Sequence, residues 1–260
     1  MKAAPQAPWV TPFPALVVLS LAACATPEEL ASGPPRTPAE TLAALEERTG
    51  KVRSLYGVVE IAYDGPDREG TFDAIVHWRA GRAGGELRLT AYKDLFLAAP
   101  DVFDLLLLPG EWALVADDHA LKRRGPRAEL PASEPRFAAI HWAGEAMFLA
   151  GLIGTEPRVA GEGERRLLRT TLSSGAAAVW TVDPRTLAVP EGEVIAPDGR
   201  RIALRFSDWK APAAGVLLPG RVELHDPTGE TRMEMRLQEY ELDPALADEL
   251  FSPDAVLESD

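Results

Sequence analysis

The fold is decided by the stretch Leu55-Tyr56-Gly57-Val58-Val59-Glu60-Ile61-Ala62-Tyr63-Asp64. Its odd-numbered positions, from Leu55 to Tyr63, are all apolar or glycine, whereas the even-numbered positions include Glu60 and Asp64. A period of two places alternate side chains on opposite faces of a β-strand. The stretch is therefore predicted to be a strand with one buried face.

The same period continues on both sides of several turn signals. Phe72 to Trp78 and Leu87 to Ala91 alternate in the same way, with turns at Gly65-Pro66 and Gly84-Gly85. Similar segments occupy 101–124 and, after a break in the pattern, 167–242. Short connections favour antiparallel neighbours. We therefore expect a single curved antiparallel sheet, a half-barrel of about ten or eleven strands.

Two segments have helical spacing and are expected to cover this sheet, which makes the fold class α+β. The first begins at Thr37-Pro38-Ala39-Glu40, where threonine can cap the helix, proline suits its first turn, and Glu40 lies three residues after the cap. The second runs from Phe137 to Leu152, with apolar residues on one face. Because so long a sheet must curl or be covered, residues 37–260 are predicted to form a single domain.

The N-terminus predicts a bacterial lipoprotein. An apolar run of 11 residues ends in Leu21-Ala22-Ala23-Cys24, and this is the only cysteine of the chain. The run is too short to cross a bilayer, so residues 1–23 are predicted to be a signal peptide and Cys24 the acylated first residue. The alternative is an ordinary secretory signal with a chance cysteine. Residues 24–36 are expected to form the acylated cysteine and a flexible tether, and Ala25 favours the periplasmic side of the outer membrane.

Composition excludes several classes of function. The formal net charge is −13, which disfavours binding to nucleic acid and to anionic headgroups through a basic surface. Membrane attachment is therefore expected through Cys24 and its acyl chains, such as palmitate. The four histidines have no metal-ligand spacing, and no Gly-x-Ser-x-Gly is present. We expect no enzyme activity, no metal and no cofactor.

Three local features resemble the LolA/LolB lipoprotein-carrier superfamily. They are Leu55 to Ile61 after an N-terminal helix, the apolar helix Phe137–Leu152 between two sets of strands, and Leu218-Pro219-Gly220-Arg221-Val222 followed by Leu250-Phe251-Ser252-Pro253. The resemblance spans nearly all of 37–260. It implies a half-barrel around a hydrophobic cavity that takes up acyl chains. It also implies a protruding apolar loop for membrane insertion, for which Leu95, Phe96 and Leu97 are the candidates; the alternative is that they continue a buried strand.

The predicted function is to bind a lipid or the acyl chains of lipoproteins, with a role in outer-membrane lipoprotein localisation. The candidate cavity residues are large apolar side chains of the strands and the central helix. They are Leu55, Val59, Ile61, Phe72, Val76, Trp78, Leu87, Leu89, Phe137, Ile140, Met147, Phe206, Met233 and Met235. These residues either line a cavity or close on one another as a dry core. The alternative function is a structural lipoprotein that scaffolds a complex with an envelope protein partner.

Overall fold

The computed structural model describes most of the chain after residue 33. The described residues are 34–65, 69–81, 85–92, 101–116, 120–130, 137, 140, 153–161, 163–172, 174–211, 216–226 and 231–258. The predicted signal peptide, Cys24, most of the predicted tether and the candidate insertion loop Leu95, Phe96 and Leu97 lie outside them. Most of the predicted central helix also lies outside them.

Thirteen antiparallel strands form one sheet. They are β1 (Ser54–Asp64), β2 (Glu69–Arg79), β3 (Glu86–Tyr92), β4 (Asp101–Leu107), β5 (Glu111–Ala116), β6 (Leu121–Pro126), β7 (Thr155–Ala160), β8 (Arg166–Thr171), β9 (Ala177–Val182), β10 (Glu191–Ile195), β11 (Arg201–Ser207), β12 (Arg221–His225) and β13 (Arg232–Leu242). Their spatial order is β6-β5-β4-β3-β2-β1-β13-β12-β11-β10-β9-β8-β7. The first and last strands of the chain therefore meet in the middle of the sheet.

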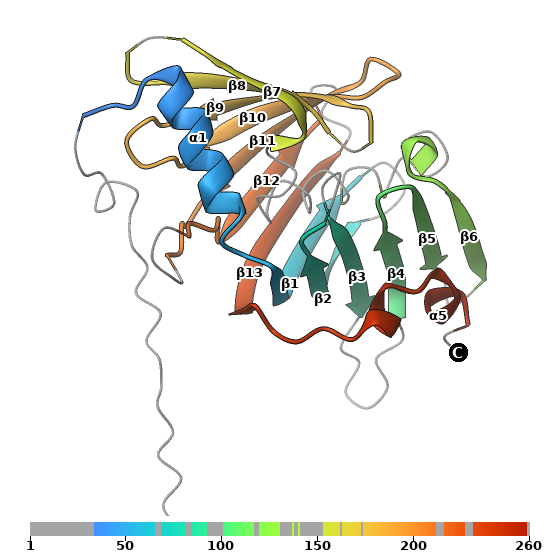
Figure 1. The fold of residues 1–260 in the computed structure, drawn as a ribbon. Coiled ribbons are helices and arrows are strands. Elements are labelled where there is room, and N and C mark those ends of the chain that lie inside the picture. Colours follow the sequence, from blue (N-terminus) through green and yellow to red (C-terminus); the bar gives the residue numbers. More distant parts are fainter. Residues whose placement is uncertain are drawn as a thin grey trace, which may run out of the picture.

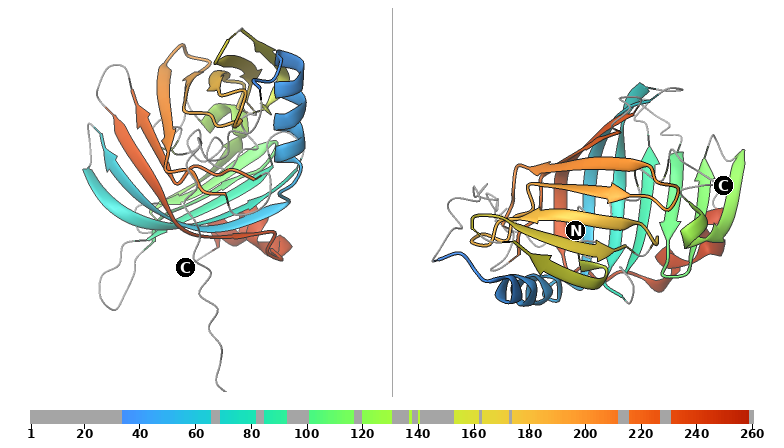
Figure 2. Two further views of the ribbon diagram at one scale, coloured as in Figure 1. Left: turned by 90° about the vertical axis from the view of Figure 1, so that its left-hand side faces the viewer. Right: turned by 90° about the horizontal axis from the view of Figure 1, so that it is seen from above.

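This order makes β6 and β7 the two edges, although they are consecutive along the chain. The segment between them must therefore travel from one edge of the sheet to the other. Figures 1 and 2 show that the sheet is strongly curved, with β7–β11 folded over the half that contains β1–β6. Phe137 and Ile140, two helical residues of the connecting segment, are buried in the same core as the inner side chains of the strands. The curvature of the sheet thus brings the inner side chains of both halves into one core, to which Phe137 and Ile140 also belong.

The predicted N-terminal helix is present as α1 (Pro38–Thr49). The Thr37 side chain accepts from the backbone N–H of Glu40 at 3.3 Å, and the Thr37 backbone N–H donates to Glu40 Oε2 at 2.8 Å. This reciprocal pair satisfies two N–H groups that would otherwise lack partners at the start of a helix. The helix contacts β7 at one edge and leads directly into β1 at the centre of the sheet (Figure 1).

The sequence-based expectation of ten or eleven strands is too low. The clearest omission is β7, which carries Pro157 and an irregular register between Thr155 and Arg158. Proline lacks the N–H needed in a sheet interior and is tolerated at edges and bulges, so this segment has no regular strand pattern. The predicted curved antiparallel sheet is confirmed, with more strands than expected.

Helical cover also differs from the expectation, because part of it lies on the outer face. The 3₁₀ helix η3 (Asp248–Phe251) packs against β3, and α5 (Pro253–Leu257) packs against β4 and β5, on the side away from the main core (Figure 1). Phe251 and Val256 there form a second buried cluster with Leu106, Ala113 and Val115. Another 3₁₀ helix, η2 (Arg127–Glu129), follows β6. Within the described part of the chain, no helix has both the length and the apolar character to span a membrane.

Candidate functional site

The inner face of the sheet is a continuous apolar surface built by cross-strand rows. In one row Phe72, Ile61, Met235, Val222 and Phe206 lie side by side on β2, β1, β13, β12 and β11. Each is paired directly with the next, so their side chains project from the same face. The alternation in five separate segments of the sequence thus generates one surface.

The candidate cavity residues that the structure describes are brought together on this surface. Leu55, Val59, Ile61, Val76, Trp78, Leu87, Leu89, Phe137, Ile140, Phe206, Met233 and Met235 are all buried in one cluster, and Phe72 packs against it partly buried. Met147 lies outside the described residues. The clustering of these side chains follows from the strand register, whereas their contact with a ligand stays a prediction.

Small and large side chains alternate near the middle of the inner face. Val59, Ala74 and Ala91 lie in one row that continues to Phe103 and Ala116. Phe103 makes edge contacts with Phe72 and with Phe137 of the connecting segment, at ring-centroid distances of 5.7 and 5.1 Å. Phe137 therefore packs against the row that contains these short side chains, through its contact with Phe103.

Polar groups are few on this face and several of them have no partner. The indole N–H groups of Trp112 and Trp180 and the hydroxyl of Ser174 are buried without a hydrogen-bond partner within the described structure. A surface of this composition offers burial of apolar area, at roughly 25 cal/mol per Å², and little directional recognition. Its chemistry suits hydrocarbon chains.

Helix α1 is attached to the domain by arginine side chains that donate to backbone carbonyl groups. Arg36, just before the helix, donates to the carbonyl oxygens of Pro184 and Arg185 at 3.0 and 2.6 Å. Arg48, in the last turn, donates through Nη1 to the carbonyl oxygen of Leu187 at 2.6 Å. Helix α1 is thus held by hydrogen bonds to the loop between β9 and β10.

The sequence analysis did not identify these arginines. A signal was present, because Thr41, Leu45, Arg48 and Val52 recur at helical spacing and lie on one face. Leu45 and Val52 of this set belong to the inner core, and Thr41 and Arg48 are buried beside them. A charged residue on the buried stripe of a helix marks a position that needs a polar partner.

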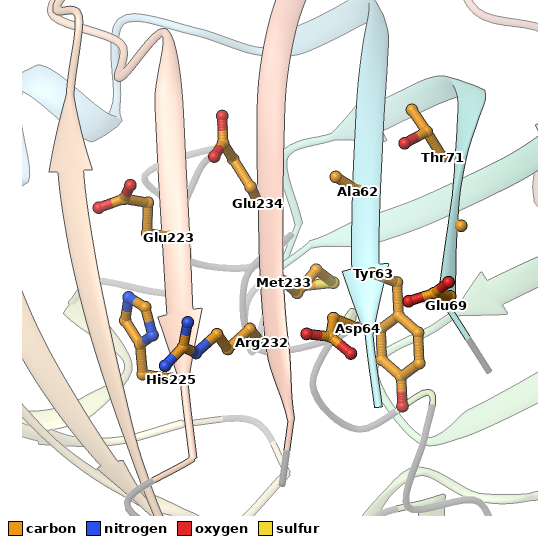
Figure 3. A pocket seen from close by; sticks show the side chains of 11 residues that line it. Ala62, Tyr63, Asp64, Glu69, Thr71, Glu223, His225, Arg232, Met233 and Glu234 are labelled. Carbon is orange, nitrogen blue, oxygen red and sulfur yellow. The ribbon is translucent and has the colours of Figure 1, made fainter. Parts of the chain in front are cut away.

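The outer face carries charged side chains and a shallow depression of about 580 Å³. Figure 3 shows its lining residues, which come from β1, β2, β12 and β13 and include Asp64, Glu69, Glu223, His225, Arg232 and Glu234. Nearby, Arg221 forms ion pairs with Glu223 at 2.6 Å and with Glu234 at 2.8 Å. This charged surface is unsuited to an acyl chain.

A polar cluster among the described residues can serve as a metal site or as part of the packing. No group of three or more His, Cys, Asp or Glu side chains within them lies close enough to hold a metal ion. The buried pair Arg88–Asp104, at 2.6 Å, is tied to the hydroxyl of Thr90 and to the backbone of Leu250 under the C-terminal segment. That pair is therefore part of the packing between the sheet and its outer cover.

The curled antiparallel sheet and the N-terminal helix define a LolA/LolB-like fold. Three solved structures share it. A DUF1329 family protein from Desulfovibrio piger has 14% identity and a TM-score of 0.62, over 86% of this chain and 100% of that one. A putative outer membrane lipoprotein-sorting protein domain from Vibrio parahaemolyticus has 13% identity and a TM-score of 0.57, over 85% and 100%. A LolA superfamily protein from Nitrosomonas europaea has 14% identity and a TM-score of 0.55, over 84% and 99%.

Sequence comparison adds no closer relationship. No family model matches the chain, and no curated protein matches it. At 13–14% identity the structural similarity establishes the fold alone, and the resemblance inferred from the sequence motifs is confirmed at that level.

Proposed function

We propose that this protein binds a lipid, or the acyl chains of a lipoprotein, on the inner face of its sheet and performs no catalysis. The observation that carries the proposal is the uninterrupted apolar inner face, where side chains from both halves of the sheet meet in common rows. Acyl chains bind by burial of apolar area and need few directional contacts. The structural similarity to a lipoprotein-sorting domain and a LolA superfamily protein agrees with this class of ligand.

Short side chains form the floor of the proposed binding surface. Ala74 and Ala91 lie side by side in the row that leads to Phe103, and Phe103 contacts Phe137 at a ring-centroid distance of 5.1 Å. A chain of methylene groups would lie against these alanines and replace the contact between Phe137 and Phe103.

Ala74→Phe tests this proposal because it places a large side chain among the short side chains of the inner face. Ala74 is fully buried on the inner face, whereas Ala203 of β11 is exposed on the outer face, so Ala203→Phe is the matched control. Native mass spectrometry with lipid extraction, and titration with a fluorescent fatty acid, would measure ligand content. We expect wild type and Ala203→Phe to carry and bind ligand, and Ala74→Phe to lose most of that binding while circular dichroism shows a retained fold. A ligand-free wild-type protein that also ignores the fatty acid would refute the proposal.

We further propose that residues 1–23 are removed and that Cys24 is acylated, which holds the domain at the periplasmic face of the outer membrane. Two or three acyl chains anchor a protein stably because each buried methylene contributes about 0.8 kcal/mol. Cys24→Ser should move the protein from the membrane fraction to the soluble fraction and abolish labelling by a palmitate analogue. Unchanged fractionation of Cys24→Ser would contradict lipid anchoring.

A scaffold for an envelope protein complex is the second candidate function. The specific observation in its favour is the charged depression on the outer face, which remains available while the inner face holds a lipid (Figure 3). Crosslinking in cells distinguishes the two functions. One stoichiometric protein partner without any bound lipid or lipoprotein client would favour the scaffold.

A further inference from the structure

Arg48 carries a buried charge whose hydrogen-bonding capacity is only partly used. Its side chain is 3% exposed, and Nη1 donates to the carbonyl oxygen of Leu187 at 2.6 Å. Nε and Nη2 are buried and have no hydrogen-bond partner in the described structure. Burial lowers the pKa of Arg48 to about 10, so the group keeps its positive charge at neutral pH. Among the described residues, no carboxylate forms an ion pair with Arg48.

The two unused donors form one edge of the guanidinium group. In Arg88 the same two atoms, Nε and Nη2, donate to the two carboxylate oxygens of Asp104 at 3.1 and 2.6 Å. This planar fork matches the spacing of two oxygens in a carboxylate or a phosphate. Arg48 therefore presents, without an acceptor, the edge that Arg88 uses to bind an anion.

The position of Arg48 connects this edge to the inner face. Arg48 follows Leu45 by three residues on α1 and precedes Val52 by four, and both of these apolar side chains belong to the inner core. The helix buries only Thr41, Leu45 and Arg48 of its own residues. Leu45 is the one fully buried apolar side chain of α1, and Leu42 and Ala44 are only partly buried against the core, so α1 can shift at a modest loss of apolar burial and admit a polar group beside Arg48.

We propose that Arg48 binds the anionic headgroup of an amphiphile whose hydrocarbon part lies on the inner face. This inference rests on the proposed function and narrows it to ligands that carry a carboxylate or a phosphate. A headgroup would supply the acceptors that Nε and Nη2 lack, and the strong cost of an unpaired buried charge would be relieved only in the bound state. The binding face thereby gains the directional element that its apolar side chains do not provide.

A comparison of palmitic acid with its methyl ester tests the proposal, because the two ligands differ in charge and share the chain. Displacement of a neutral fluorescent probe from the mature protein would measure both affinities. We expect wild type to bind the acid at least about 10-fold more tightly than the ester, a difference typical of one charge-assisted contact. Arg48→Met should bind the two ligands alike, with an unchanged affinity for the ester. An equal preference for the acid in wild type and Arg48→Met would overturn the proposal.

Arg127→Met is the matched control for loss of a buried guanidinium. Arg127 is as buried as Arg48, but it donates to the carbonyl oxygens of Gly85 and Leu108 in the other half of the sheet. It should lower stability and retain the preference for the acid. Loss of the preference in Arg127→Met as well would point to general destabilisation and refute a specific role for Arg48. Arg48→Lys keeps the charge but lacks the paired donors Nε and Nη2, so it should prefer the acid over the ester less strongly than wild type does. A preference for the acid equal to that of wild type would contradict recognition by the Nε–Nη2 edge.

Three further outcomes separate a lipid headgroup from free phosphate, and the role of Arg48 from the proposed function. Inorganic phosphate should neither displace the probe nor raise the melting temperature of wild type. If phosphate stabilises wild type but not Arg48→Met, and wild type shows no preference for the acid, the site binds free anions. That result would overturn the assignment of Arg48 to a lipid headgroup. Binding of both ligands to wild type with equal affinity would refute the role of Arg48 and leave the proposed function intact. Binding of neither ligand would refute the proposed function itself.

Discussion

Gly192 of β10 lies directly opposite Trp180 of β9, and the indole ring occupies the space above it. A Cβ at this position would overlap the six-membered part of that ring, so the tryptophan could not keep its place in the core. Gly192→Ala is therefore expected to destabilise the protein by about 1–3 kcal/mol, as overpacking of a dense core does. Urea unfolding monitored by circular dichroism would measure the loss.

The control for this substitution is Gly70→Ala in β2. Nothing lies within 4 Å of a Cβ built there, so its stability should change by no more than about 0.5 kcal/mol. Equal effects of the two substitutions would show that strand propensity, rather than the close approach of Trp180, requires the glycine.

His77 makes the stability of the fold depend on pH. Its imidazole lies on the outer side of β2, 5.5 Å from the ring of Tyr56 and close to Arg88 and Asp104. Burial, and then the charge of Arg88, lower the pKa of His77 below 6.5, while Asp104 acts in the opposite direction. Below that pH the unfolded chain binds a proton that the folded chain resists, so stability should fall as the pH decreases from 7 towards 5.

Substitution of His77 isolates this contribution. The urea midpoint of His77→Gln should decrease less than that of wild type between pH 7.5 and pH 5.5, because glutamine does not take up the proton. An identical pH dependence in His77→Gln and wild type would mean that other groups cause the acid destabilisation.

The C-terminal segment acts as the cover of the outer apolar patch. Phe251 of η3 is 6% exposed, packs in the cluster that contains Leu106 and Val115, and lies under the guanidinium of Arg79 at 4.5 Å. Arg79 also pairs with Asp248 at 2.5 Å. Phe251→Ala should cost roughly 3 kcal/mol, at the lower end of the range for a buried phenylalanine, because the segment can partly collapse onto the sheet.

Hydrogen exchange would locate the effect of Phe251→Ala. The amides of β4 and β5 should lose protection, whereas those of β9 and β10 should keep it. Leu167→Ala provides the comparison, since Leu167 is 39% exposed and its loss should cost less than about 0.5 kcal/mol. If Phe251→Ala lowers stability no more than Leu167→Ala does, the packing of the C-terminal segment on the sheet does not stabilise the fold.

The predictability of these elements follows from how many faces each one buries. Strands with one buried face, such as β1, have a clear period of two, and their inner residues Leu55, Val59 and Ile61 were identified from the sequence. In β4 and β5 both faces are covered, so Leu105, Leu106 and Leu107 form a continuous run without periodicity. The outer cover was missed for that reason, because the run did not reveal a second apolar face.

The candidate site was predictable in its apolar part and not in its polar part. The period of two within each strand places its large apolar residues on one face, and this can be read without knowing which strands are neighbours. The role of Arg48 depends on contact with Leu187, which is far away in the sequence and has a left-handed backbone with φ of 63°. Neither the contact nor that conformation has a signature in the amino acid types, so the helical spacing indicates that Arg48 is buried but not which group it contacts.

The meeting of β1 and β13 in the centre of the sheet joins the two halves of the chain into one structure. These strands are 11 residues long and pair along nearly their whole length. Trp112 in β5 and Trp180 in β9 lie in opposite halves, yet both belong to the same core cluster. Neither half can then keep its inner face buried after the other unfolds, so unfolding should be a single cooperative transition.

Fluorotryptophan labelling tests this cooperativity without changing the core. The ¹⁹F signals of Trp112 and Trp180, assigned through single Trp→Phe variants, should lose their folded intensity at the same urea concentration. The central pairing leaves no boundary at which the sheet could separate, because the register of β1 with both β2 and β13 is continuous except for one bulge at Val58 and Val59. Two distinct midpoints would show instead that the bulge divides the sheet into halves that fold independently, and that the inner face opens along this line.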